Sequence, residues 1–375
     1  MTSTTTDSNP DGVGLPRSRG DQSTRVGIPD GDPSSSIDVS FIVAARDVAP
    51  FIAEAIGSVL RQEGCSIEVV VVDDASRDAT ASIVADLARK DPRVRLLRLP
   101  ESRGASAARN VAMAAACGTW IAVVDGDDRI APDRSARLLE AAALWSADIV
   151  ADNVMRFDDL SSRRSTMMPL GPHPYSFFLQ TDEYIRSISP MAGSPNFGYL
   201  KPMFRHSRLK EHSLVYREDL RIGEDSQICL EALLAGLQYL VVSEASYHYR
   251  VRPGSLSWRL EQSDVAALEH ATIAAVRARS RVETQTSGAL PTYLSALERV
   301  KVILRVIDSM QNRRPAEAVR LVMVKPACFR DGIASGAGTS IQSTWPDRRA
   351  ATRALASGIG SSRTLSTLAI RFGSQ

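Results

Sequence analysis

At 375 residues, the chain is long enough for one large α/β domain with an appended helical part, or for two domains. Its apolar fraction of 44% and charged fraction of 23% are ordinary for a globular protein. The four cysteines (Cys65, Cys117, Cys229 and Cys328) form no CxxC pair, which argues against a zinc site or a disulfide framework and indicates a reducing, cytoplasmic compartment. No apolar run approaches the roughly eighteen residues of a membrane span, and the N-terminus lacks the apolar core of a secretory signal.

The net charge of +2 is unevenly distributed. Residues 262–375 contain 16 Lys or Arg against 8 Asp or Glu, a charge of +8, which leaves −6 for the rest of the chain. A basic C-terminal part suits an anionic membrane surface, so peripheral contact with the inner membrane is one interpretation. The other is that these helices only pack on the main domain. We expect no nucleic-acid partner.

Strands and helices alternate after a leader of 36 residues. Residues 1–36 are rich in Ser, Thr, Asp, Gly and Pro and are interpreted as disordered. From Ile37 onward, the spacing of strands and helices fits right-handed βαβ crossovers, which predicts a doubly wound, mostly parallel sheet with helices on both faces. The predicted strands are Val39–Val43, Ile67–Val72, Val94–Leu99, Trp120–Val124 and Asp148–Ala151, and the predicted helices are Pro50–Gln62, Ala79–Ala88, Ser106–Ala116 and Arg134–Trp145.

The second half of the chain is predicted to end in a helical extension. Residues 156–176 are polar and proline-rich and are interpreted as a loop or lid, whereas Gly193–Arg205 has a composition suited to a sugar pocket or to ordinary core. A helix over Gln227–Ala235 is capped by Asp225 or Ser226. We expect a main domain over 37–261, a basic helical extension over 262–334 and a loosely ordered tail over 335–375.

Three carboxylates follow the buried strand in WIAVVDGDD. Asp125, Asp127 and Asp128 cannot all stay ionised side by side without a counter-charge. A divalent cation with oxygen ligands, Mg²⁺ or Mn²⁺, supplies that charge and carries a phosphorylated substrate. The alternative is a plain acidic turn after a strand.

A second acidic pair predicts a nucleotide site. Asp73 and Asp74 end the neighbouring predicted strand, and the carboxyl ends of such strands border one crevice in a doubly wound sheet. Between the two clusters lies Arg103–Asn110, in which Arg109 is suited to hold a phosphate. The alternative is that Arg109 is a solvated helix residue.

A further acidic pair, Glu224 and Asp225, precedes the helix of residues 227–235. A carboxylate held at a helix start makes a good general base, and its alternative role is an acidic helix cap. The later segment YHYRVR supplies Arg250 and Arg252, which are placed to close over a diphosphate, and His248, which is equally a structural histidine.

The ordered motifs VSFIVAARD, AIGSVLRQ, EVVVVDDASRDAT, SRGASAARN, WIAVVDGDD, GEDS and YHYRVRPGSLS span Asp38 to Ser257. Together they resemble glycosyltransferase family 2, with the GT-A fold. The resemblance implies transfer of a sugar from a nucleotide-sugar, usually UDP-linked, with inversion. The acceptor would be a saccharide or lipid-linked saccharide in surface polysaccharide synthesis.

The resemblance also implies roles for single residues. Asp225 is the base that deprotonates the acceptor hydroxyl, with Glu224 beside it. On the donor side, Asp74 meets the nucleotide base, Asp127 lies near the ribose and the metal, and Asp128 is a metal ligand. Asp125 completes the acidic motif, and Arg109 is the arginine of the ARN element. The family usually has Pro-x-Tyr-Asn after the first strand, where this chain has Ala44-Ala45-Arg46-Asp47. We place Ala44 and Arg46 at the donor pocket, where Arg46 stacks on the base or reaches a phosphate.

Two other functions remain open from the sequence. A nucleotidyltransferase also uses an acidic metal site on a doubly wound sheet, although AARDVAPF is not its usual glycine-rich loop. The second function is that of a non-catalytic nucleotide-sugar-binding protein of the same fold, which the altered motif after the first strand suggests. A phospho-receiver explains Asp73 and Asp74 but leaves residues 220–257 without a role.

Overall fold

The computed structural model describes residues 13–14, 37–159, 164–171, 173–190, 195–252, 260–278 and 288–325. The predicted tail over 335–375 and all but two residues of the predicted leader lie outside this range, as do Cys328 and the Ser255–Ser257 part of the last motif. Within it, no helix is both long enough and apolar enough to cross a bilayer.

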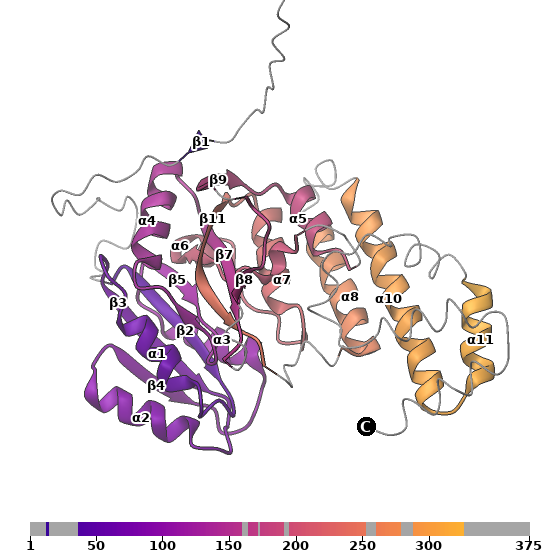
Figure 1. The fold of residues 1–375 in the computed structure, drawn as a ribbon, viewed down its shortest axis with the longest axis horizontal. Helices are drawn as coiled ribbons and strands as arrows, with labels where there is room; N and C mark the ends of the chain where they lie inside the picture. Colours follow the sequence, from indigo (N-terminus) through magenta and orange to yellow (C-terminus); the bar gives the residue numbers. More distant parts are fainter. Residues whose placement is uncertain are drawn as a thin grey trace, which may run out of the picture.

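The described strands form one mixed sheet of eleven (Figure 1). Its main path runs β1-β9-β11-β7-β10-β5-β2-β3-β4, with β6 paired to β11 and β8 to β7. Strands β5, β2, β3 and β4 pair in parallel, as do β7 and β11. The bounds are β1 Val13–Gly14, β2 Val39–Ala45, β3 Ile67–Asp73, β4 Val94–Arg98, β5 Trp120–Val123, β6 Arg129–Ile130, β7 Ile149–Phe157, β8 Arg164–Thr166, β9 Tyr175–Phe178, β10 Met203–Arg205 and β11 Tyr239–Arg250.

Helices flank the sheet and extend beyond it. Helix α3 packs on β2 and β3, α4 on β7 and β11, and α7 on α5 and α8. In Figure 1, α8, α10 and α11 continue away from the sheet beyond α7. The bounds are α1 Ile52–Leu60, α2 Thr80–Lys90, α3 Ala105–Ala115, α4 Arg134–Trp145, α5 Thr181–Ile188, α6 His206–Glu211, α7 Glu224–Leu234, α8 Gln262–Ala278, α10 Ala289–Gln311 and α11 Pro315–Val324, with a 3₁₀ turn, η1, at Phe197–Tyr199.

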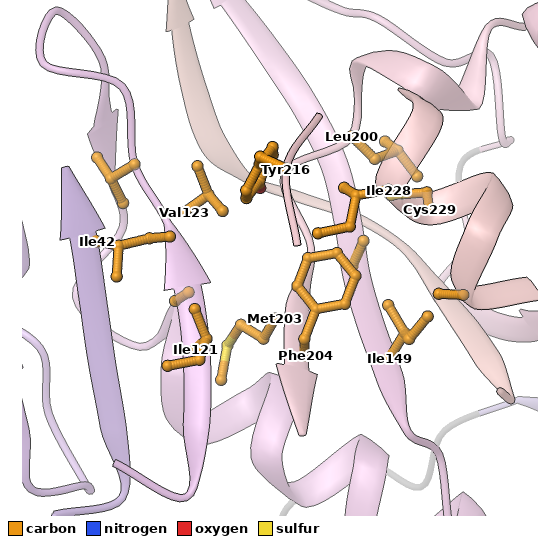
Figure 2. Close-up of a cluster of buried hydrophobic side chains, with 14 of the residues drawn as sticks. Ile42, Ile121, Val123, Ile149, Leu200, Met203, Phe204, Tyr216, Ile228 and Cys229 are labelled. Atoms are coloured by element: carbon orange, nitrogen blue, oxygen red, sulfur yellow. The ribbon is translucent and has the colours of Figure 1, made fainter. Parts of the chain in front are cut away.

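The antiparallel strand β10 joins the two parallel parts of the sheet. Met203 pairs with Ala122 of β5 on one side and with Val150 of β7 on the other. Figure 2 shows Met203 and Phe204 among buried side chains from both parts, including Ile121 and Ile149. Because one continuous core spans β10, the two halves of the sheet are fixed relative to each other.

Three local predictions need correction. Helix α7 begins at Glu224 and has Gly223 as its N-cap, so neither Asp225 nor Ser226 caps it; Gly223 has a φ of 88°, a conformation that favours glycine. Strand β7 extends to Phe157 rather than ending at Ala151. The segment predicted as a loop at 156–176 contains strand β8 and the start of β9, because their backbones complete the sheet next to β7 and β11.

Candidate active site

The sheet register places Lys201 at the end of β5. Strand β10 runs antiparallel to β5, with Met203 opposite Ala122 and Phe204 opposite Ile121. Lys201 precedes Met203 by two residues, so the antiparallel register places it just beyond the end of β5, next to Asp125. The buried Arg134 guanidinium holds this segment by donating to the Lys201 carbonyl at 2.6 Å.

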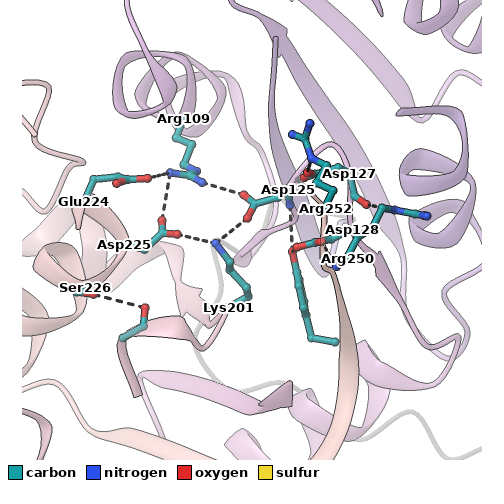
Figure 3. A network of polar contacts seen from close by, with 12 residues as sticks. Arg109, Asp125, Asp127, Asp128, Lys201, Glu224, Asp225, Ser226, Arg250 and Arg252 are labelled. Carbon is teal, nitrogen blue, oxygen red and sulfur yellow. Dashed lines mark hydrogen bonds and ion pairs between the residues drawn. The ribbon is translucent and has the colours of Figure 1, made fainter. Parts of the chain in front are cut away.

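Two cations and three carboxylates form a closed network between the loop after β5 and the first turn of α7 (Figure 3). Lys201 Nζ lies 2.7 Å from Asp125 Oδ2 and 2.6 Å from Asp225 Oδ2. On the other side, Arg109 donates to Asp125 Oδ1 at 2.8 Å and to Glu224 Oε1 at 2.7 Å, and its Nη1 lies 3.1 Å from Asp225 Oδ1. The loop after β5 and the first turn of α7 are thereby joined through the same two cations.

Arg109 is a buried centre of this network and not a solvated helix residue. It lies in the second turn of α3, is 4% exposed, and its guanidinium stands 5.2 Å from the ring centroid of Tyr216. Burial lowers the pKa of Arg109, but Asp225, Asp125 and Glu224 outweigh it and raise that pKa well above its usual value. A permanently charged guanidinium is therefore held where three carboxylates meet.

The network sets the charge state of its other members. Burial raises the pKa of Asp125, but Lys201 and Arg109 outweigh it and hold that pKa below its usual value. Burial lowers the pKa of Lys201, but Asp125 and Asp225 outweigh it and raise that pKa well above its usual value. For Glu224, burial and the neighbouring Asp225 raise the pKa despite Arg109. Asp125 and Lys201 are thus an ion pair at neutral pH.

Asp128 points into the core rather than into the crevice. It is 1% exposed; its Oδ2 accepts from the Tyr247 hydroxyl at 2.8 Å, and its Oδ1 accepts from the Arg250 backbone N–H at 2.8 Å. Burial, then Asp125 and Asp127, raise the pKa of Asp128 well above its usual value. This geometry does not support the predicted role of Asp128 as a metal ligand, because both of its oxygens bind protein donors in a buried position.

Asp127 is the carboxylate of this loop that pairs with Arg252. One of its oxygens, Oδ2, accepts from the Arg252 Nε, and its carbonyl accepts from the Arg250 Nε at 2.7 Å. Among the described residues, no three His, Cys, Asp or Glu side chains are grouped to hold a metal. Mg²⁺, however, is commonly held by one or two carboxylates together with substrate phosphates. Asp127 therefore fits a cation that is shared with a bound diphosphate.

Arg250 is tied to the protein on several sides. Its guanidinium pairs with Glu54 and Asp159 and stands 4.7 Å from the ring centroid of Phe157. Arg252, which pairs with Asp127, is the more exposed of the two predicted diphosphate ligands. His248 lies in β11, edge-to-face with Phe157 at a centroid distance of 6.5 Å.

Asp74 and Arg46 meet at the ends of β2 and β3. The buried Asp74 carboxylate accepts from the backbone N–H groups of Arg103 at 2.7 Å and Gly104 at 3.0 Å, and from the Ser102 hydroxyl at 2.8 Å. Arg46 donates to the same hydroxyl and lies 3.7 Å from Asp74 Oδ2. Asp74 thus fixes the loop that leads into α3.

Ala44 and Asp73 border the same edge of the sheet. Ala44 lies opposite Val72 in the β2–β3 pairing. A hollow of about 430 Å³ opens beside this edge, lined by Ala75, Ser76, Arg98, Leu99 and Pro100. Asp73 is fully buried, and its Oδ2 lies 3.8 Å from Arg98 Nε.

Sequence reasoning brought most of these residues together but missed two. It did not identify Lys201, although a lysine in the otherwise apolar stretch GYLKPMF was a usable signal. It also missed Tyr247, whose hydroxyl accepts from the Asp125 backbone N–H at 3.1 Å and donates to Asp128.

The sheet and the helices around it have the GT-A fold. Among solved structures, that of S. aureus TarS residues 1–349 in complex with UDP-GlcNAc is similar with a TM-score of 0.55, at 19% identity, over 79% of this chain and 92% of that one. At this identity the likeness concerns the fold alone.

Sequence comparison gives the family. The model named Glycosyl transferase family 2 matches residues 40–207. The succinoglycan biosynthesis protein ExoO of Rhizobium meliloti is 37% identical over 78% of this chain and 83% of its own length, and ExoU of the same organism is 32% identical over 68% and 73%. The chain belongs to glycosyltransferase family 2 and is a glycosyltransferase, which confirms the resemblance drawn from its motifs.

Proposed function

We propose that this glycosyltransferase moves a sugar from a UDP-sugar to a hydroxyl of a saccharide or lipid-linked saccharide, with inversion, in the synthesis of a surface polysaccharide. One observation carries the proposal: the acidic loop after β5 and the first turn of α7 are linked through the side chains of Lys201 and Arg109. In the proposed function, the loop after β5 holds the phosphates and the metal, and the candidate base lies on α7 beside it. The names of ExoO and ExoU support the product class, and the TarS complex supports a UDP-sugar.

The donor is placed along the carboxyl ends of β2, β3 and β5. The hollow beside Ser76 and Arg98 is the proposed place of the nucleoside, with Ala44 and Arg46 at its edge. Asp74 then shapes this pocket through the loop at 102–104, and two exposed cations lie at this end of the sheet: Arg98 in the lining of the hollow and Arg46 beside Asp74. The diphosphate would extend toward Asp127, where Arg252 is available to meet it.

Asp225 is proposed as the base of the reaction, with Glu224 beside it. The acceptor oxygen attacks the anomeric carbon on the face opposite the diphosphate, its proton passes to the Asp225 carboxylate, and the bond between that carbon and the diphosphate oxygen breaks with its electron pair. A positioned base contributes typically about 10²–10⁴-fold to such a step. A cation held by Asp127 would offset the charge on the departing diphosphate.

A nucleotide-release screen tests the proposal directly. The full chain is incubated with UDP-, GDP- and dTDP-sugars, with Mg²⁺, Mn²⁺ or a chelator, and the released nucleoside diphosphate is measured with and without saccharide acceptors. We expect release from a UDP-sugar that depends on the divalent cation and rises with acceptor. Release from GDP-sugars alone would reject the donor assignment, and full activity in chelator would reject the metal.

We also propose that the protein binds peripherally to the cytoplasmic face of the membrane through helix α11. Val319, Met323 and Val324 are 42%, 76% and 68% exposed, and exposed Arg313 and Arg320 lie on or next to the same helix. Apolar side chains among cations suit an anionic bilayer surface. The Met323→Ser/Val324→Ser variant should no longer float with anionic liposomes. A matched Val215→Ser variant, which removes an exposed apolar side chain from another part of the surface, should still float with them. Equal flotation of the two variants would contradict the proposal.

A further inference from the structure

Lys201 is the one member of the charge network that the sequence motifs leave without a role. Its side chain is 10% exposed, and its ammonium bridges Asp125 and Asp225 at 2.7 Å and 2.6 Å. Its carbonyl accepts from Arg134, which itself binds the buried Asp152 through two hydrogen bonds of 3.0 Å and 2.8 Å. The backbone that carries the ammonium is therefore anchored in the core.

The bridge connects two elements that are far apart in the sequence. Asp125 follows β5 on the side proposed for the donor, and Asp225 lies in the first turn of α7, on the side proposed for the acceptor. A second cation, Arg109, also pairs with these two carboxylates, but it binds Glu224 as well. Lys201 binds Asp125 and Asp225 alone among the network's carboxylates.

We propose that Lys201 is a positioning residue for the transfer step: it holds the Asp225 carboxylate at a fixed place relative to the acidic loop after β5. The inference rests on the proposed function, in which Asp225 receives the acceptor's proton. Without the ammonium, Arg109 alone would offset the like charges of Asp125 and Asp225, and it also binds Glu224, so the first turn of α7 would be held less closely to the loop. A displacement of about 1 Å at such a site costs about 10²-fold in rate.

The test compares Lys201→Met with Lys301→Met. Lys301 makes the same kind of bridge, between Glu269 and Glu298 at 2.7 Å each, but it lies in the helical extension. In Lys201→Met we expect kcat to fall about 10²-fold, while the dissociation constant of UDP changes less than about threefold. Lys201→Arg, which keeps the charge, should recover part of kcat, and Lys301→Met should keep the wild-type kcat.

A second measurement does not depend on activity. Hydrogen exchange of the Gln227 amide, the first in α7 to donate along the helix (to the Gly223 carbonyl at 2.9 Å), should be faster in Lys201→Met than in wild type, and unchanged in Lys301→Met. An unchanged kcat, or a loss explained wholly by weaker UDP binding, overturns the inference. If the wild-type protein releases no nucleotide from any donor, the proposed function fails, and the hydrogen exchange alone then decides whether Lys201 positions α7.

Discussion

The backbone N–H of Arg250 donates to Asp128 Oδ1, so the end of β11 is fixed to the acidic loop after β5 although 122 residues separate the two. The Tyr247 hydroxyl binds the other oxygen of the same carboxylate and also accepts from the Asp125 backbone N–H. Three adjacent aspartates thus have three different surroundings. Asp125 belongs to the charge network, Asp127 pairs with Arg252, and Asp128 holds the loop against the sheet.

This division predicts that Asp128→Ala affects stability first. The substitution leaves the Tyr247 hydroxyl and the Arg250 N–H buried without their acceptor, and each such loss costs about 1–3 kcal/mol. Urea unfolding should show a drop of the unfolding free energy of about 2–6 kcal/mol for the two groups together, with wild-type slope. A change below about 0.5 kcal/mol, the usual size for a surface position, would mean that Asp128 does not hold the loop.

Asp127→Asn should affect the cation requirement instead. Its carboxylate is the proposed protein ligand of a cation shared with the diphosphate, and the described residues contain no group of three His, Cys, Asp or Glu side chains that could hold a metal without it. The Mn²⁺ concentration for half-maximal nucleotide release should rise about tenfold or more, with little change in unfolding free energy. The matched variant is Asp133→Asn, an exposed aspartate outside the crevice; an equal shift in both variants would remove Asp127 from the cation site.

The Asp225→Asn variant tests the base. The amide keeps the shape of the carboxylate but accepts no proton, so kcat should fall by about 10²–10⁴-fold. Binding of UDP, followed by calorimetry, should stay within about threefold of wild type. The control for a lost carboxylate on α7 is Glu231→Gln, near the C-terminal end of the same helix. Transfer at the wild-type rate in Asp225→Asn would assign the base to another residue.

The βαβ part of the fold was predictable because its signals are local. Runs such as Ile67–Val72 are buried on both faces, and the helix predicted over Arg134–Trp145 has the bounds of α4. The antiparallel strand β10 was not predictable, because three residues give no periodicity. Lys201 was missed for the same reason: its place beside Asp125 follows from the register of β10, which only the assembled sheet sets.

The chemistry of the site was partly readable from residue types. Clusters at strand ends placed Asp125 and Asp127 in one crevice, since carboxyl ends of parallel strands share an edge. Sequence spacing does not say which way a side chain turns, and for this reason Asp128 and Asp74 were assigned to ligands although their oxygens bind protein donors. Such orientations depend on Tyr247 and on the loop at 102–104, which lie far away in the sequence.

The buried pair of Arg134 and Asp152 should contribute strongly to the stability of the fold. Both side chains are almost fully buried, and Asp152 Oδ2 also accepts from the Ser246 N–H at 3.0 Å. Arg134→Met leaves the Asp152 charge without its partner, which costs about 3–5 kcal/mol. The control is Arg137→Met on the same helix, whose half-exposed ion pair with Glu244 is worth no more than about 1 kcal/mol. Similar unfolding midpoints for the two variants would contradict this account.

The helical extension should lose stability in acid through Glu298. This carboxylate binds Lys301 and Lys325, and those hydrogen bonds lower its pKa from 4.5 to about 2. Because the folded pKa is depressed, the stabilisation is fully present above the unfolded value of 4.5 and is lost as the pH falls toward about 2. Glu298→Gln removes this contribution at every pH. The difference in Tm between wild type and Glu298→Gln should therefore be largest above pH 5 and shrink steadily between about pH 4.5 and 2.5. Glu317→Gln, on the neighbouring helix α11, controls for a general loss of negative charge from the extension. A Tm difference that stays constant through this range would show that the two lysines do not stabilise the ionised Glu298.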